Sequence, residues 1–301
     1  MSKLVARIGV PALALLALAG CGSSNSSTSS TATTTSSTSS AGANAAIAAQ
    51  VPAAIKSKGT ITVAADATYA PNEFIASDGH TVIGMDADLM KALGSEMGLK
   101  VNIVNATFDS IIPGLAAGKY DIGASSFTDT KEREKTVDFV DYFSAGISFY
   151  AKSSSNPAVK TVEDLCGKTV SVEKGTTEEE EATEQGKKCT KAGKKSVTTL
   201  VYPTQNEANL AISSGRAELG MADSPIAAYQ VKQSSGAFKL VGETYGAAPY
   251  GLAIPKNSGM TTPVLAALKA LIANGTYMQI LTKWGVQSGA ITTPAINGAT
   301  S

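Results

Sequence analysis

The chain has 301 residues, with 25 lysines and arginines, 25 aspartates and glutamates and one histidine, so its formal net charge at pH 7 is zero. It has no basic patch and no run that interleaves aromatic and basic residues, which argues against a nucleic-acid partner. The single histidine, His80, lies in a turn-like stretch, so a hydrolytic triad and a cluster of metal ligands both lack their usual members. We therefore expect no metal, no cofactor and no enzymatic activity.

Residues 1–20 have the pattern of an export signal. Lys3 and Arg7 precede an apolar stretch from Val10 to Ala19, which is too short for the roughly 20 residues that span a bilayer. The ending Leu18-Ala19-Gly20-Cys21 is similar to the lipobox of bacterial lipoproteins. We expect Cys21 to become an acylated N-terminus, with palmitate among its lipids, that holds the protein on the outer face of the cytoplasmic membrane. Plain secretory cleavage nearby is the alternative.

Residues 21–50 are expected to form a tether. From Ser23 to Ser40 every residue except Asn25 and Ala32 is serine or threonine, and no charge follows Cys21 until Lys56. A segment of this composition cannot build a core, and as a flexible coil it would span on the order of 30 Å. That reach is enough to lift a folded domain off a membrane surface.

From residue 58 the chain alternates short β-rich runs with helical periodicity, which is typical of an α/β fold with parallel strands. We expect irregular chain over residues 66–74 and a hairpin turn at Asp78-Gly79. The predicted strands are Thr60–Ala65, Val101–Val104 and Asp121–Ala124, and the predicted helices are Met85–Leu99 and Phe108–Ala117.

A second unit of the same style begins after Tyr150. Its predicted strands are Thr169–Glu173, Val197–Tyr202 and Glu218–Ala222, and its predicted helices are Thr177–Lys191 and Asn206–Ser214. The run Glu178 to Glu181 is interpreted as a solvated helix face. In an exported domain Cys166 and Cys189 are expected to form a disulfide, with two free buried thiols as the alternative.

The chain then returns to a strand at Gly251–Ile254 and to helices at Thr262–Ala273 and Tyr277–Trp284. This order predicts an α/β protein of two lobes, with two hinge strands and a ligand cleft between the lobes. Lobe 1 is discontinuous and comprises residues 51–150 and 249–288, lobe 2 comprises residues 151–248, and residues 289–301 form a C-terminal tail.

Three loops that follow predicted strands carry the functional signal. They begin Asp66-Ala67-Thr68-Tyr69, Ala106-Thr107-Phe108 and Ser125-Ser126-Phe127, and the last ends at Arg133. In order and spacing they resemble the family 3 solute-binding proteins of bacterial ABC importers, the polar amino acid branch, over nearly all of residues 58–286. The resemblance implies the type II periplasmic-binding-protein fold, and a monomer that binds a polar amino acid outside the cell and delivers it to permease subunits.

The resemblance also implies how the ligand's headgroup is held. Arg133 matches the arginine that binds the α-carboxylate, and its guanidinium offers two parallel N–H donors suited to that group. Asp223 matches the aspartate that binds the α-ammonium. Pairing of Arg133 with Glu132 or Asp129 at the surface, and helix capping by Asp223, are the alternatives. Further expected contacts to the headgroup come from Ser125, Ser126, Phe127 and Thr128, and from Thr176 and Thr177 at a helix N-terminus.

The side chain of the ligand is expected to lie between the rings of Tyr69 and Phe108. Asp66 matches the aspartate that meets the distal group of the ligand, and Glu173 adds a second carboxylate. Together they favour a cationic or amide side chain, with a basic amino acid preferred, and exposure of Glu173 to solvent is the alternative. The alternatives are a ligand-sensing domain and an exported dehydratase on the same fold, for which Glu73 is the best catalytic candidate.

Overall fold

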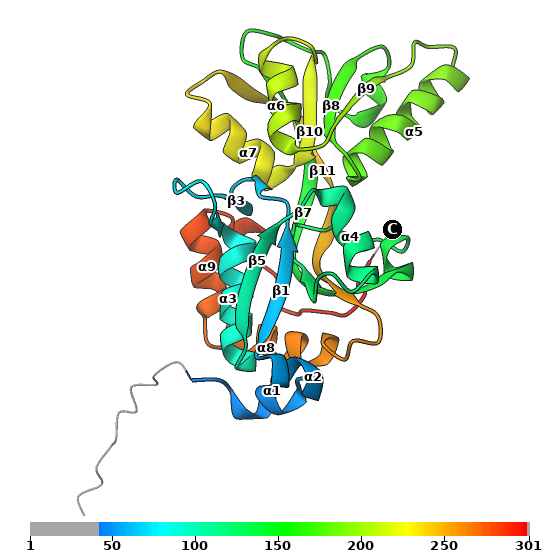
Figure 1. The fold of residues 1–301 in the computed structure, drawn as a ribbon. Helices are drawn as coiled ribbons and strands as arrows, with labels where there is room; N and C mark the ends of the chain where they lie inside the picture. The colour runs from blue at the N-terminus through cyan, green and yellow to red at the C-terminus, as the bar shows by residue number, and fades with distance from the viewer. Residues whose placement is uncertain (1–41, 300–301) are drawn as a thin grey trace, which may run out of the picture. The chain divides into compact units, whose positions relative to one another are not determined.

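The computed structural model describes residues 42–299. The signal sequence of residues 1–20, the acylation of Cys21 and most of the tether lie outside these residues. The described chain is an α/β structure whose elements gather into two lobes joined by long strands (Figure 1). The predicted fold class is therefore confirmed.

One mixed sheet of eight strands runs through both lobes in the order β5-β1-β6-β11-β7-β10-β8-β9. The strands are β1 (Thr60–Ala65), β5 (Lys100–Asn105), β6 (Ile122–Gly123), β7 (Val137–Lys152), β8 (Thr169–Glu173), β9 (Thr198–Tyr202), β10 (Leu219–Asp223) and β11 (Phe238–Pro255). Strand β1 pairs in parallel with β5 and β6, and β8 pairs in parallel with β9 and β10. Each lobe thus has the parallel sheet that its sequence pattern predicted.

Strands β7 and β11 form the hinge. They pair antiparallel from Phe238 opposite Lys152 to Pro255 opposite Val137, so both pass from one lobe into the other. The register is interrupted between Val241 and Tyr245 and again before Ala248. Sequence reasoning predicted a strand only at Gly251–Ile254, because the middle of each hinge strand lacks a regular alternation of apolar residues. The hinge strands join the parallel strands of the two lobes into one sheet without a separate linker.

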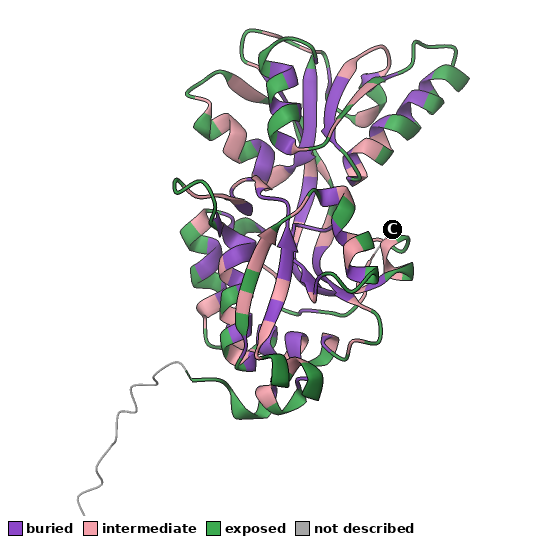
Figure 2. Cartoon of the chain, in the orientation of Figure 1, coloured by how far each residue is buried: buried purple, intermediate pink, exposed green. Residues whose placement is uncertain are grey.

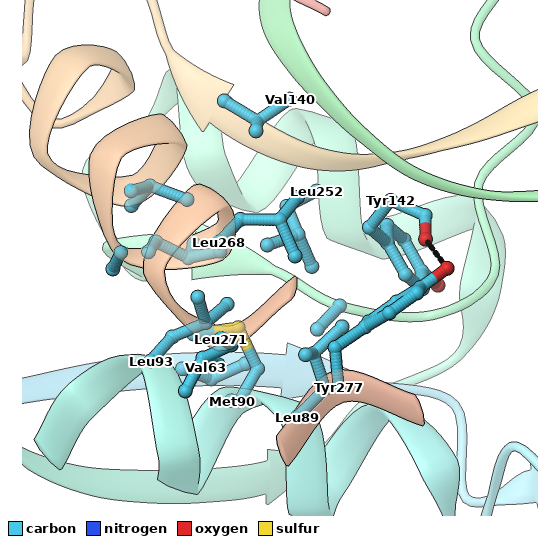
Figure 3. Close-up of a cluster of buried hydrophobic side chains, with 14 of the residues drawn as sticks. Val63, Leu89, Met90, Leu93, Val140, Tyr142, Leu252, Leu268, Leu271 and Tyr277 are labelled. Carbon is cyan, nitrogen blue, oxygen red and sulfur yellow. Dashed lines mark hydrogen bonds between the residues drawn. The ribbon is translucent and has the colours of Figure 1, made fainter. Parts of the chain in front are cut away.

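The core of lobe 1 lies between the sheet and the helices α3 (Met85–Met97), α8 (Thr261–Ala273) and α9 (Thr276–Trp284). Leu89 and Leu93 of α3 are buried in this core. Figure 3 shows these side chains packed against Val63 and Leu252, with the Tyr277 hydroxyl donating to the Tyr142 carbonyl at 2.7 Å. A second cluster lies under α4 (Phe108–Ala116) and includes Phe127.

Lobe 2 surrounds its strands with α5 (Thr177–Lys191), α6 (Gln205–Ser213) and α7 (Ser224–Gln233). Strands β8 and β10 are largely buried, whereas the outer faces of these helices are exposed (Figure 2). The predicted disulfide between Cys166 and Cys189 is confirmed, with a Cα–Cα distance of 5.5 Å. It ties the end of the 3-10 helix η2 (Val162–Leu165) to α5.

Two short helices correct the predicted extent of the tether. Helix α1 (Ala45–Gln50) is capped by the Asn44 side chain, and α2 (Ala53–Lys58) follows it. Ile47 and Val51 are buried in the core of lobe 1. The prediction that the tether extends to residue 50 is therefore wrong, because apolar residues after position 44 pack into the core of lobe 1.

The structure differs from the sequence-based prediction in two further segments, the predicted irregular chain of residues 66–74 and the predicted C-terminal tail. The stretch after β1 forms a small antiparallel sheet of β2 (Thr68–Tyr69), β3 (Glu73–Ile75) and β4 (Val82–Ile83). After the 3-10 helix η3 (Gln287–Gly289), the C-terminal segment lies along β7, with Ala290 bridged to Phe143 and Ile296 to Val140. The segment is therefore part of lobe 1.

Candidate ligand-binding site

A cavity lies between the lobes where the loops after several strands converge. Its lining comprises Asp66, Tyr69, Phe108, Ser125, Ser126, Thr128, Arg133, Glu173, Thr176, Thr177, Glu178 and Asp223. Eleven of the twelve predicted ligand-binding residues are in this set. Sequence reasoning missed Glu178 and wrongly included Phe127.

Arg133 reaches into the cavity from the 3-10 helix η1 (Arg133–Lys135) of lobe 1. Its Nη1 donates to the Thr128 carbonyl at 2.8 Å, and its Nη2 donates to the Gly175 carbonyl of lobe 2 at 3.0 Å. These two bonds use two of the five N–H donors of a guanidinium, so others remain for an anion. Burial lowers the pKa of Arg133, while Glu180 and Glu178 oppose that shift. No ion pair of Arg133 with Glu132 or Asp129 forms within residues 42–299.

Asp223 enters the same cavity from the end of β10 in lobe 2. It stands at the N-cap position of α7, but its side chain makes no capping hydrogen bond. Its Oδ2 instead accepts from the Tyr69 hydroxyl at 2.8 Å, across the cleft. Burial raises the pKa of Asp223 to about 6, and the charge of Arg133 acts in the opposite direction. The guanidinium and this carboxylate therefore face one shared cavity.

A second pair of acids meets across the cleft. Asp66 follows β1 in lobe 1, Glu173 ends β8 in lobe 2, and each is only 2% exposed. Asp66 accepts from the Phe108 N–H at 3.0 Å, whereas Glu173 Oε1 is buried without a hydrogen-bond partner among the described residues. Burial, and then Asp66, raises the pKa of Glu173 well above its usual value. Within residues 42–299 neither carboxylate pairs with a lysine or arginine, and a cationic donor between them would satisfy both.

Aromatic rings form one wall. Phe108 lines the cavity, and Phe127 stacks behind it with ring centroids 4.5 Å apart. The Arg133 guanidinium lies 5.4 Å from the centroid of Phe108, within the range of a cation–π contact. The prediction that Phe127 lines the cavity is wrong because its ring points into the core under α4 and is 1% exposed.

Buried carboxylates accept hydrogen bonds from the two serines that line the cavity. Ser126 has a φ of 52°, in the left-handed region, and its N–H donates to Asp86 at 2.9 Å. The Ser125 and Ser126 hydroxyls donate to Glu73 at 3.2 and 3.3 Å. Glu73 is fully buried beneath these serines and is not part of the cavity lining. Its carboxylate is therefore placed to position the serine loop.

The N-terminus of α5 forms the lobe 2 side. Thr176 is the N-cap and accepts from the Glu179 N–H at 3.2 Å. Thr177 and Glu178 follow in the first turn, and Glu178 is 2% exposed. The interpretation of Glu178 to Glu181 as a solvated face is wrong for its first residue, because the start of the helix abuts the cleft.

The cleft is closed. Besides the bonds of Tyr69 and Arg133, the Gln205 N–H donates to Thr68 Oγ1 at 3.2 Å, and Lys174 pairs with Asp109 at 2.7 Å. The space that remains in the cavity is about 10 Å³, roughly enough for one water molecule. The lobes would therefore have to separate to admit a ligand of amino-acid size.

A pair of buried acids, Asp129 and Asp141, lies outside the cavity. Asp129 belongs to the loop that carries Thr128 and Arg133. Neither oxygen of Asp129 has a hydrogen-bond partner among the described residues, and the neighbouring Asp141 accepts from the Gly298 N–H at 3.1 Å. Burial, and then Asp141, raises the pKa of Asp129 to about 7 from a model-compound value of 3.8. A proton on Asp129 would therefore relieve the repulsion between the two carboxylates.

We expect Asp129→Asn to stabilise the protein at pH 8. The raised pKa contributes stability that is complete below pH 4 and is lost as the pH rises through 7. An asparagine amide keeps a donor toward Asp141 at every pH, so the gain at pH 8 should be about 1 to 2 kcal/mol, with little change at about pH 4. Thermal unfolding at both pH values measures this gain, with Glu132→Gln on the exposed side of the same loop as control. Equal effects of Asp129→Asn on stability at the two pH values would contradict a raised pKa of Asp129.

No group of three or more His, Cys, Asp or Glu side chains within the described part of the chain is arranged to hold a metal ion. The carboxylates of the cavity are instead arranged in two groups. Asp66 and Glu173 form one, and Asp223 with Glu178 forms the other, next to Arg133. This alternation of charge is complementary to a molecule that carries two cationic groups and one anionic group.

Comparisons with known proteins identify the family of the chain. The family model for bacterial extracellular solute-binding proteins, family 3, matches residues 61–287. The arginine-binding protein ArgT of Corynebacterium glutamicum is 37% identical over 252 residues, which cover 83% of this chain and 82% of that protein.

Two solved structures are similar over most of the described chain. An ancestral arginine-binding protein bound to arginine is 37% identical, with a TM-score of 0.69, and the match covers 75% of this chain and 98% of that one. The ancestral amino acid-binding protein AncCDT-1, a precursor of cyclohexadienyl dehydratase, is 36% identical, with a TM-score of 0.69 and coverage of 77% and 97%.

Proposed function

Because the chain belongs to the bacterial extracellular solute-binding proteins of family 3, we propose that it captures a basic amino acid, preferentially arginine, and delivers it to the permease of an ABC importer. In this proposal the protein acts as a monomer outside the cytoplasm, anchored by a lipid on Cys21. The observation that supports arginine is the meeting of Asp66 and Glu173 from opposite lobes without a cation between them.

The proposed pose follows from the charges. The ligand's α-carboxylate accepts hydrogen bonds from the free N–H groups of Arg133, and its α-ammonium pairs with Asp223. Its guanidinium pairs with Asp66 and Glu173. A guanidinium suits this last pair because it presents several N–H donors in a plane and stays charged in a desolvated site. The alkyl stem would lie against Phe108 and Tyr69.

Closure follows from the same contacts. Without a cation, bringing Glu173 toward Asp66 places two carboxylates in a dry site, which is costly. An arginine that bridges the lobes offsets this cost only when they close, so it shifts the population toward the closed form by its differential affinity. The permease would then receive protein that carries its ligand.

We expect arginine to stabilise the purified domain strongly and citrulline to do so weakly. Citrulline keeps the shape of arginine but replaces the guanidinium by a neutral urea group, so two acids remain without a cation. With a micromolar dissociation constant, 1 mM arginine would add about 4 kcal/mol, or a rise in melting temperature of roughly 8 to 15 °C. Thermal-shift measurements with arginine, lysine, ornithine, histidine, glutamine and citrulline test this. A flat response to every basic amino acid would refute the proposal.

A further inference from the structure

Glu178 lines the cavity and has a buried carboxylate oxygen without a hydrogen-bond partner among the described residues. Its Oε2 accepts from the Thr177 hydroxyl at 3.1 Å, but its Oε1 is buried and has no hydrogen-bond partner among the described residues. An unsatisfied buried carboxylate oxygen costs free energy until a donor reaches it. A donor would approach Glu178 from the cavity, because Glu178 is part of the cavity lining.

The position of Glu178 is not explained by helix stability alone. Acids in the first turn of a helix interact favourably with its dipole. Glu179 and Glu180 are also in the first turn of α5, and Glu179 Oε2 accepts from the Gly175 N–H at 2.6 Å. Those two side chains are partly or fully exposed, whereas Glu178 is buried against the ligand site.

Asp223 is the near neighbour of Glu178. Burial, and then the charge of Asp223, raises the pKa of Glu178 to about 8, so the pair disfavours two negative charges in the closed, empty cleft. The other titratable groups that face this pair are Arg133 of η1, Tyr69 of β2, Tyr150 of β7, Glu173 of β8 and Tyr245 and Tyr250 of β11. Arg133 is the one cation in that set, and the proposed function assigns it to the ligand's carboxylate.

Resting on the proposed function, we propose that Glu178 is a second anionic partner of the ligand's α-ammonium and acts together with Asp223. An ammonium group has three N–H donors, and two carboxylates from the same lobe can each accept one. Where Glu178 is protonated, its O–H bond breaks as the ammonium enters, the proton passes to solvent, and the N–H bonds of the ligand stay intact. Glu178 thereby selects ligands with a free α-amino group.

The test compares Glu178→Gln with the wild type against two ligands. L-Arginine carries the α-ammonium, and 5-guanidinopentanoic acid has the same guanidinium and carboxylate without it. By isothermal titration calorimetry at pH 8, we expect the substitution to weaken arginine binding about tenfold and to change the binding of 5-guanidinopentanoic acid by less than about twofold. Glu184→Gln, on the exposed face of α5, is the matched control and should change neither.

The pH dependence provides a second readout. Ligand binding favours ionised Glu178, so its contribution to affinity is present at pH 8 and is lost as the pH falls toward 6, where Asp223 also begins to take up a proton. The ratio of wild-type to Glu178→Gln affinity for arginine should therefore shrink between pH 8 and pH 6. Glu178→Asp, which keeps the charge, should retain this pH dependence and serves as the second variant.

Equal losses for the two ligands would overturn the role of Glu178, because a structural defect does not distinguish a ligand with an α-ammonium from one without. A ratio of affinities that does not vary with pH would do the same. Failure of arginine to bind the wild type is a separate result, and it would refute the proposed function itself.

Discussion

Arg133→Ala is expected to abolish the binding of arginine at micromolar concentrations while the fold remains intact. The substitution removes the guanidinium proposed to pair with the ligand's α-carboxylate in a site closed to water. Truncating one partner of a buried, hydrogen-bonded charge pair costs about 3 to 4 kcal/mol, which weakens binding roughly 150- to 1,000-fold. Titration calorimetry measures this loss directly.

Arg216→Ala provides the matched control for Arg133→Ala. Arg216 is an exposed arginine of lobe 2 that lies over the ring of Tyr202, away from the cavity lining. We expect Arg216→Ala to bind arginine as the wild type does. Unfolding curves without ligand should be similar for the two variants, since among the described residues the Arg133 side chain makes two hydrogen bonds, both to backbone carbonyls. If Arg133→Ala binds within threefold of the wild type, the carboxylate of the ligand is held elsewhere.

Glu173→Gln is expected to lower the affinity for arginine roughly 10- to 100-fold and to leave citrulline binding nearly unchanged. Hydrogen bonds to charged groups contribute about 1.5 to 3 kcal/mol, and the amide cannot supply the negative charge that a guanidinium favours. The same substitution removes the repulsion between Glu173 and Asp66. The ratio of the two affinities, measured by competition or calorimetry, isolates the charge at this position.

Glu207→Gln is a suitable control for Glu173→Gln, because Glu207 is exposed on α6 and outside the cavity lining. A parallel fall in arginine and citrulline affinity would mean that Glu173 shapes the cleft without recognising charge. Unchanged affinities for both ligands would place the guanidinium elsewhere in the cavity. Either result would leave the role of Arg133 open to its own test.

The one tryptophan of the chain offers an optical readout of these titrations. Trp284 of α9 packs edge-on against Phe74 at 5.6 Å, and Phe74 lies 6.5 Å from Tyr229 of α7 in lobe 2. This contact joins elements of both lobes near the hinge. Separation of the lobes changes the surroundings of Phe74, so the emission of Trp284 reports on closure in the variants above.

Much of the fold could be predicted because local signals and packing agree. Strand Thr169–Glu173 and helix Thr177–Lys191 have the predicted bounds, since a β-branched run and a Thr-capped helix each match their surroundings. Asp66, Glu173 and Asp223 could be grouped because each stands at the carboxyl end of a parallel strand in its lobe. Such ends share one edge of a sheet, and here the two edges face each other.

The tertiary structure alone decided which neighbours of these residues face the ligand. Phe127 points away because Ser126 adopts a left-handed conformation, so the alternation of a strand does not extend through the loop. Glu178 faces the cavity because the hinge strands bring the first turn of α5 against lobe 1, a contact that a run of four glutamates does not encode. The sequence by itself determined the kinds of charge available for recognition, since these depend on residue type and strand order. Their pairing across the cleft depended on packing between segments more than 100 residues apart, which no local pattern records.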